Sequence, residues 1–132
     1  MSNRSVISTP AAPAAIGPYS QAIRVDKTVW VSGQIPLDPE SMEIVSTDIS
    51  AQARQVFSNL AAIAEAAGGG LEDAVKINIS LTDLADFAAV NQVMAGFFPA
   101  PFPARACVEV AALPRAARIE VEMIMVLRAT AP

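Results

Sequence analysis

The sequence contains no histidine, and its 132 residues include one cysteine, one tryptophan and one tyrosine. The absence of histidine excludes a Ser-His-Asp triad, a Cys-His catalytic pair and every metal site that uses imidazole. The single cysteine, Cys107, cannot form an intrachain disulfide or a thiolate zinc site, and such cysteine usage is typical of a reducing cytoplasm. Chemistry must therefore rely on carboxylates, Arg, Lys, Tyr, Ser, Thr, one thiol or backbone groups.

Charged residues are also scarce, at 17% of the chain, against roughly 25% in typical soluble domains. The 9 Lys and Arg residues and 13 Asp and Glu residues give a net charge of -4, which argues against nucleic acid or an anionic membrane as the main partner. Hydrophobic residues make up 53%, although so small a chain buries only about two-thirds of its unfolded surface. This composition predicts a second burial event, most simply self-association.

No segment has the character of a membrane span or an export signal. The longest uncharged stretch, residues 87–104, is interrupted by Asn91, Gln92, Pro99, Pro101 and Pro103, whereas a span needs about 20 mostly apolar residues in an unbroken helix. Near the N-terminus, Pro10 and Pro13 interrupt any apolar signal-peptide core. We expect a soluble, unexported, cytoplasmic protein.

No linker, repeat or charge block divides the chain, so we expect one domain over residues 1–132. The proline-rich residues 9–18 predict an ordered or semi-extended arm. Strands are expected over residues 19–25 and 28–34, with Asp26-Lys27 as the turn, and over residues 75–81, where polar and apolar residues alternate. Two more strands are expected at about 105–113 and 119–128, joined through Pro114.

Two segments have helical periodicity. Asp48 is a good N-cap for a first helix, whose apolar residues recur from Ile49 to Ala67 and which Gly68-Gly69-Gly70 ends. Asp83 can cap a second helix, which the prolines from Pro99 onward stop. The order β-β-α-β-α-β-β predicts an α+β fold with both helices on one face of a mixed sheet.

The other face of that sheet is not fully polar. In the last strand Ile119, Val121, Met123 and Met125 point one way, and Glu120, Glu122, Ile124 and Val126 the other. One side can be covered by the helices, and nothing left in the chain can cover the other. A neighbouring subunit in a closed ring of identical chains could do so; the alternative is an ordinary exposed face with a few apolar residues.

Arg105, Cys107 and Glu109 share one face of their strand. If the final two strands pair as a hairpin, Glu120 and Glu122 lie near Arg105 and Cys107. The guanidinium could then bind a substrate carboxylate through two parallel hydrogen bonds, while a glutamate orients or deprotonates a water. The alternative is a structural cross-strand Arg–Glu pair.

The other polar candidates also have ordinary structural explanations. Cys107, with no histidine to lower its pKa, is better explained as an inert, buried small hydrophobe. Tyr19 can be a packed aromatic, Ser32 a strand hydroxyl, and Gly33 a point of bending or close backbone approach.

Several segments together resemble the RidA (YjgF) family of imine deaminases, from about Thr9 to Val126. They are 12–22 (APAAIGPYSQA), 32–36 (SGQIP), 86–91 (DFAAVN), 102–111 (FPARACVEVA), 113–114 (LP) and 119–122 (IEVE). The resemblance implies a chorismate-mutase-like homotrimer with a central barrel, and ligand clefts between subunits. It also implies hydrolysis of enamine and imine acids, such as 2-aminoacrylate, 2-iminopropanoate and 2-iminobutanoate, to 2-oxo acids and ammonia. Removing these products of pyridoxal-phosphate-dependent dehydratases would protect other pyridoxal-phosphate enzymes.

The same resemblance implies roles for individual residues, and no metal or cofactor. Arg105 matches the residue that binds the substrate carboxylate, and Glu120 the acid that positions the attacking water. Cys107 matches a contact to the imine end, through its backbone or thiol. The cleft would be lined by Tyr19, Ser32, Gly33, Asn91 and Phe87, some of them from the neighbouring chain.

Two features depart from the family pattern. The connection 99–101 is shorter and richer in proline, and Met94 stands where an aromatic is common. The alternative function is a non-catalytic module that binds small carboxylates or another protein through the same cleft. A ribonuclease or translation-inhibiting role is disfavoured by the acidic balance and the lack of histidine, whereas deamination in pyrimidine or aromatic catabolism stays open.

Overall fold

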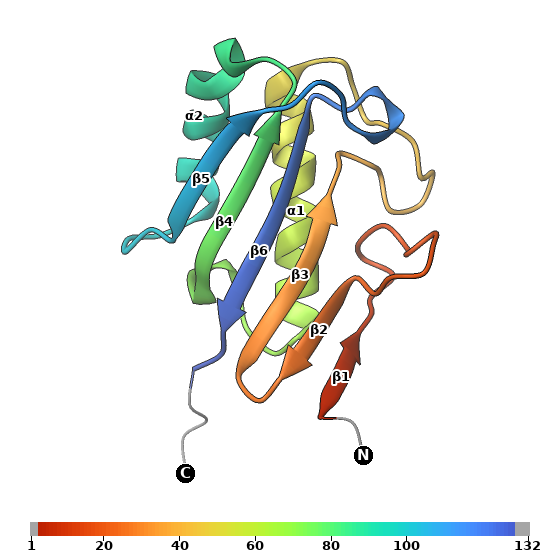
Figure 1. Ribbon diagram of the computed structural model, residues 1–132, viewed down its shortest axis with the longest axis vertical. Coiled ribbons are helices and arrows are strands. Elements are labelled where there is room, and N and C mark those ends of the chain that lie inside the picture. Colours follow the sequence, from red (N-terminus) through yellow and green to blue (C-terminus); the bar gives the residue numbers. More distant parts are fainter. Residues whose placement is uncertain (1–2, 129–132) are drawn as a thin grey trace.

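A computed structural model of the chain describes residues 3–128 and contains one six-stranded sheet, in the order β1-β2-β3-β6-β4-β5. Only β4 and β5 run parallel; all other neighbours are antiparallel. Both helices lie on the same face of the sheet (Figure 1), which confirms the predicted α+β arrangement. The strands are β1 (Arg4–Ile7), β2 (Ala22–Val25), β3 (Thr28–Gln34), β4 (Ala74–Leu81), β5 (Ala104–Glu109) and β6 (Ile119–Val126), and the helices are α1 (Ile49–Ala66) and α2 (Phe87–Phe97).

The helix boundaries follow from local chemistry. The carboxylate of Asp48 accepts a hydrogen bond from the Ala51 N–H at 2.9 Å, so the predicted N-cap of α1 is confirmed. The helix ends before Gly68, whose φ of 96° is a left-handed conformation that glycine adopts at little cost. Asp83 caps a short 3-10 turn, Leu84–Asp86, and α2 itself begins only at Phe87.

The core lies between the helices and the sheet. Phe57 of α1 is fully buried, and its ring centroid lies 5.6 Å from those of Phe97 and Phe98. From the sheet, β6 contributes the predicted set Ile119, Val121, Met123 and Met125, all buried. Its position between β3 and β4 suits this apolar character. Among residues 3–128, no helix combines the length and apolar character needed to cross a lipid bilayer.

The strand pairing corrects two predictions. The last two strands do not form a hairpin, because β4 lies between β5 and β6 and pairs with both. The connection after β5 turns through Arg115 and Ala116, both with left-handed backbone conformation, and returns the chain to the middle of the sheet. The edge strand β1 was not predicted, since its four residues show neither apolar alternation nor burial.

Several predicted strand boundaries also change. The predicted strand 19–25 begins only at Ala22, after a tight turn in which the Tyr19 N–H bonds the Gly17 carbonyl. The predicted strand 105–113 is limited to Ala104–Glu109, and 119–128 to Ile119–Val126. The Asp26-Lys27 turn is confirmed by the pairing of Val25 with Thr28.

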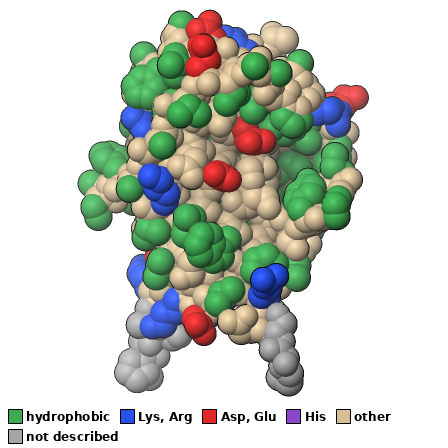
Figure 2. Space-filling model, viewed as in Figure 1, with side chains coloured by type: hydrophobic (Ala, Val, Ile, Leu, Met, Phe, Trp, Pro, Cys, Tyr) green, Lys and Arg blue, Asp and Glu red, His purple; other side chains and the backbone are tan. Residues whose placement is uncertain are grey.

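The outer face of the sheet, opposite the helices, is covered by no segment of the described chain (Figures 1 and 2). Trp30 is 52% exposed there, and Val126 and Val108 are exposed as well. Figure 2 shows acidic and hydrophobic side chains side by side on this face. A solvent-exposed aromatic ring near other exposed apolar side chains is typical of an interaction surface.

Replacing the α1 cap tests the local explanation of this helix. We expect Asp48→Ala to lower the free energy of unfolding by about 1 kcal/mol, because the Ala51 N–H loses its acceptor. Asp48→Asn keeps a capping oxygen and is the matched control, expected to stay within a few tenths of a kcal/mol of the native protein. Urea unfolding at one protein concentration measures both; equal losses in the two variants would contradict the capping role.

Candidate functional site

Arg105 lies on the edge strand β5, and its side chain is held by one face of α2. Its guanidinium donates a hydrogen bond to the Asn91 side-chain oxygen, and the Met94 sulfur lies 3.8 Å from the same nitrogen. The guanidinium carbon is 5.1 Å from the centre of the Phe87 ring, within cation–π range. Residues 87, 91 and 94 share a helix face by their spacing, so α2 fixes the guanidinium from three points.

The charge of Arg105 is not neutralised within the part of the chain that the structure describes. The ion pairs there involve Arg118 and Arg128, and no carboxylate pairs with Arg105. The side chain borders a hollow of about 430 Å³, whose other lining residues are Asn91, Met94, Ala95, Phe102 and Pro103. A fixed guanidinium beside an apolar hollow is suited to bind a small carboxylate.

Cys107 lies two residues further along β5, on the same strand face as Arg105. Its side chain is half-buried and packs against the core. Burial raises the pKa of the thiol, an effect that the nearby Arg105 charge only partly opposes. The sulfur is therefore a thiol at neutral pH and not an activated nucleophile, which agrees with its prediction as a small hydrophobe.

The backbone of Cys107 is placed differently from its side chain. The Val110 N–H bonds the Leu81 carbonyl of β4, and alternate residues of a strand direct their backbone groups the same way. The N–H groups of Arg105 and Cys107 therefore point away from β4, toward the free edge of the sheet. A ligand bound to the Arg105 guanidinium at this edge can also accept a backbone hydrogen bond.

Glu120 belongs to a second group of predicted residues. It lines a hollow of about 380 Å³ together with Tyr19, Gly33, Arg115 and eight other residues. A Cβ at Gly33 would lie only 2.9 Å from the Glu120 carboxyl carbon, so glycine permits the close approach of this carboxyl group. Partial burial raises the pKa of Glu120, and the Glu122 charge adds to this effect. The carboxyl group is thereby made a better proton acceptor than an ordinary glutamate.

Ser32 does not line the Glu120 hollow. Its hydroxyl donates to the Ser20 carbonyl at 2.6 Å. It borders a neighbouring depression on the outer face, also about 380 Å³ in volume, with Trp30, Asn78 and Glu122. There the Asn78 amide donates to the Glu122 carboxylate at 3.1 Å.

Within one chain, the prediction that Glu120 and Glu122 lie near Arg105 and Cys107 is wrong. Arg105 and Cys107 pair with Ile77 and Ile79 of β4, whose side chains are buried on the helix side. Glu120 pairs with Ser80, on the opposite face. Both the intervening strand and the opposite orientation separate the two groups. We call them the arginine half-site (Phe87, Asn91, Met94, Arg105, Cys107) and the glutamate half-site (Tyr19, Gly33, Arg115, Glu120).

Arg115 was not among the predicted site residues. It lines the Glu120 hollow, and its guanidinium donates to the Met42 carbonyl at 2.9 Å. Its backbone φ of 60° is left-handed, and this turn orients the residue toward the hollow. The sequence carries no signal for such a turn, because neither Arg115 nor Ala116 is a residue that favours positive φ.

Comparison with known proteins covers almost the whole chain. A family model described as endoribonuclease L-PSP matches residues 9–127. The RutC family protein y4sK of Sinorhizobium fredii is 53% identical over 121 residues, which are 92% of this chain and 96% of that protein. A 2-iminobutanoate/2-iminopropanoate deaminase of Dermatophagoides farinae is 49% identical over 127 residues, 96% of this chain and 99% of the relative.

A solved structure agrees with the sequence comparison. The crystal structure of RidA from the Antarctic bacterium Psychrobacter sp. PAMC 21119 superposes with a TM-score of 0.90 at 53% identity, and the match covers 93% of this chain and 99% of that one. Similarity of this extent, in sequence and in fold, includes every element that carries the two half-sites. The chain belongs to the RidA (YjgF) family.

Proposed function

We propose that this protein hydrolyses 2-imino acids and their enamine tautomers to 2-oxo acids and ammonia, with 2-iminobutanoate and 2-iminopropanoate as substrates. The observation that carries the proposal is the Arg105 guanidinium, which α2 holds beside an open hollow and which no described carboxylate neutralises. A relative that is 49% identical over nearly its whole length bears the name of this activity.

The proposed active site is shared between copies of the chain. The arginine half-site opens at the free edge of β5, and the glutamate half-site opens elsewhere, over the start of β6. A small acid cannot contact both within one chain. A second copy that places its glutamate half-site against the β5 edge of the first would complete the cleft.

Such a contact joins two different surfaces, and its repetition gives a ring when the rotation between neighbouring copies closes. We infer a homotrimer with a central barrel, in which the outer sheet faces cover one another. The exposed Trp30, Val126 and Val108 support this assembly, because burial in a subunit contact would remove their apolar area from water.

The chemistry needs few groups because the substrate is itself reactive. Arg105 binds the carboxylate, and the N–H of Cys107 at the free strand edge contacts the imine end. Glu120 orients a water and accepts its proton as the oxygen bonds to the imine carbon. Glu120 passes this proton to the nitrogen, which gives a carbinolamine. It then takes the hydroxyl proton and delivers it to the nitrogen as the carbon–nitrogen bond breaks, so that ammonia and a 2-oxo acid are released. Phe87 and Asn91 hold Arg105, and Tyr19 and Gly33 shape the other wall, while Ser32 lies in the neighbouring depression on the outer face.

In the cell, the proposed role is protective. Imine and enamine acids are released by pyridoxal-phosphate-dependent dehydratases of serine and threonine and react with other pyridoxal-phosphate enzymes. The protein would act in the cytoplasm, remove these compounds and use no cofactor of its own.

A second candidate function is binding of small carboxylates without catalysis. One observation favours it: the arginine half-site and its hollow are complete within a single chain, whereas Glu120 must come from another copy. This alternative predicts saturable binding of 2-oxo acids with no acceleration of imine loss.

Removal of the Arg105 guanidinium tests the carboxylate-binding role. With 2-iminobutanoate generated from threonine by a purified dehydratase, Arg105→Ala is expected to reduce kcat/KM roughly a hundredfold, as the loss of a charge-assisted pair implies. Arg54→Ala is the matched control, since Arg54 is exposed on α1 away from both half-sites. Full activity of folded Arg105→Ala protein would refute the role.

Mixing two inactive variants tests the shared cleft. Arg105→Ala and Glu120→Ala each disable every cleft of their own homotrimer. After unfolding and refolding together in equal amounts, about a quarter of the clefts combine an intact Arg105 with an intact Glu120 from the neighbouring chain. We expect about a quarter of the native activity, and native mass spectrometry should show three 13.8 kDa chains. A mixture as inactive as its components would exclude sharing.

The acid limb of the pH profile tests the role of Glu120. Only the ionised carboxylate accepts a proton, so kcat/KM should fall as the pH drops through the Glu120 pKa, which burial and Glu122 hold above the ordinary glutamate value. Glu122→Gln removes the neighbouring charge and should move this limb to lower pH, whereas Glu40→Gln, on an exposed loop, should not. The rate of uncatalysed hydrolysis is subtracted at each pH. An unchanged limb in Glu122→Gln would contradict the assignment.

A further inference from the structure

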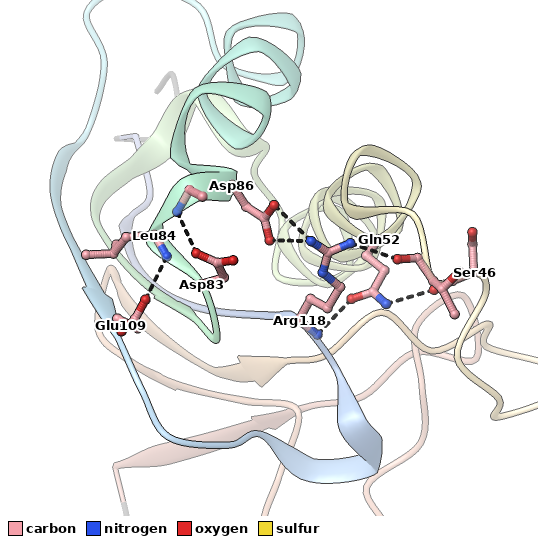
Figure 3. A network of polar contacts seen from close by, with 9 residues as sticks. Ser46, Gln52, Asp83, Leu84, Asp86, Glu109 and Arg118 are labelled. Carbon is pink, nitrogen blue, oxygen red and sulfur yellow. Dashed lines mark hydrogen bonds and ion pairs between the residues drawn. The ribbon is translucent and has the colours of Figure 1, made fainter.

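An ion pair that belongs to neither half-site joins the start of α2 to the start of β6 (Figure 3). One terminal nitrogen of Arg118 donates to both carboxylate oxygens of Asp86, at 2.9 and 2.8 Å. Asp86 is only 9% exposed. A buried carboxylate held through both oxygens has a defined orientation, and therefore so does the backbone that carries it.

Arg118 is itself fixed on several sides. Its other terminal nitrogen donates to the Thr47 carbonyl at 3.0 Å, and its backbone N–H donates to the Gln52 side-chain oxygen at 2.8 Å. The Gln52 amide donates in turn to the Ser46 carbonyl at 2.7 Å. The Arg118 carbonyl accepts the Thr82 N–H at 3.1 Å. The residue is thus a firm anchor, tied to the start of α1 and to the end of β4.

Unlike Arg118, Asp86 belongs to a segment that makes few other hydrogen bonds to the rest of the fold. It directly precedes α2, and it makes no capping hydrogen bond to that helix. In the turn before it, the Asp83 carboxylate bonds only the nearby Ala85 N–H, and the Leu84 N–H reaches Glu109 of β5 at 2.9 Å. Among these contacts, the Asp86–Arg118 pair is the one that ties the residue directly before α2 to the body of the fold.

The next residue after Asp86 is Phe87, whose ring lies over the Arg105 guanidinium, and Asn91 follows one turn later. A shift of the first turn of α2 therefore moves both contacts that orient Arg105. The pair is partly buried, since the Arg118 side chain is 37% exposed and that of Asp86 12%. Such a pair contributes little net stability, but the other contacts of Arg118 give Asp86 a partner in a fixed place. The place of the pair beside Phe87 connects this geometry to the arginine half-site.

We propose that Asp86, held by Arg118, is a positioning residue that sets the Arg105 guanidinium for binding the carboxylate of the substrate; this inference rests on the proposed function. Asp86 touches neither substrate nor reacting atoms and acts through α2. Arg118 keeps its contacts to Thr47, Gln52 and Thr82 when Asp86 is replaced, so the start of β6 and Glu120 stay in place. The loss of this restraint therefore affects binding of the carboxylate more than the chemical step.

The main test is Asp86→Asn, which keeps the shape but replaces one acceptor oxygen with an amide that repels the guanidinium. Calorimetry with 2-oxobutanoate gives Kd, and the coupled dehydratase assay gives KM for the imine substrate. We expect both constants to rise roughly tenfold, below the ~100-fold that a displacement of about 1 Å can cost. The kcat should stay within about twofold of native. A merely stabilising pair would lower the melting temperature and leave Kd and KM unchanged.

The matched control is Arg128→Gln, which breaks a different ion pair. Arg128 contacts Asp73 at 3.1 Å and Glu72 at 3.4 Å, near the end of β6. This variant should retain native Kd, KM and kcat. If Asp86→Asn does not fold, Arg118→Lys is the variant to test in its place. Its ammonium keeps the charge but cannot reach both Asp86 and Thr47, so we expect Kd and KM to rise by less than the tenfold expected for Asp86→Asn.

A further measurement does not depend on a ligand. The Arg105 guanidinium lies beside the Phe87 ring, so the NMR chemical shift of its Nε–Hε group depends on the position of that ring. This chemical shift should change in Asp86→Asn but not in Arg128→Gln. If the native protein binds 2-oxobutanoate without accelerating imine loss, the proposed deamination fails while the comparison of Kd still tests positioning. Folded Asp86→Asn with native Kd, native KM and an unshifted Arg105 resonance would overturn the inference.

Discussion

The parallel pairing of β5 with β4 decides where the chemistry of this protein can take place. Because β5 lies at the end of the sheet, Arg105 and Cys107 present their outward backbone groups at a free edge. Because Arg105 pairs with the buried Ile77, its side chain turns toward the helices and meets α2. An antiparallel hairpin with β6 would have placed the same side chain beside its own Glu120. The fold instead separates Arg105, the proposed carboxylate-binding group, from Glu120, the proposed proton acceptor, within each chain.

This separation and the uncovered sheet face have one common explanation under the proposed function. Assembly of copies would cover the exposed Trp30 and its apolar neighbours, and the same contact would bring an Arg105 and a Glu120 from different chains together. Stability and activity would then depend on the same interface. The ion pair of Asp86 and Arg118 would act on the first of these two groups, because it restrains the start of α2, which holds Arg105.

The chain has few types of side chain that can take part in catalysis, and such a small set is suited to a substrate that is already electrophilic. No nucleophile has to be activated, and Cys107 remains a neutral thiol because burial raises its pKa. Under the proposed function, the protein has only to hold a carboxylate and a water in fixed positions. Arg105 is well prepared for the first task, since ring, amide and thioether groups of α2 hold its guanidinium before any ligand arrives.

The sequence by itself determined the local elements and the identity of the candidate residues. Asp48, the apolar spacing after it and the alternation in residues 75–81 predicted α1 and β4, because these signals arise from hydrogen bonding and burial close along the chain. The motifs around Arg105 and Glu120 identified the family. Only the tertiary structure decided that β4 separates these two residues and that Asp86 meets Arg118, because strand order and contacts between distant segments follow from packing of the whole chain.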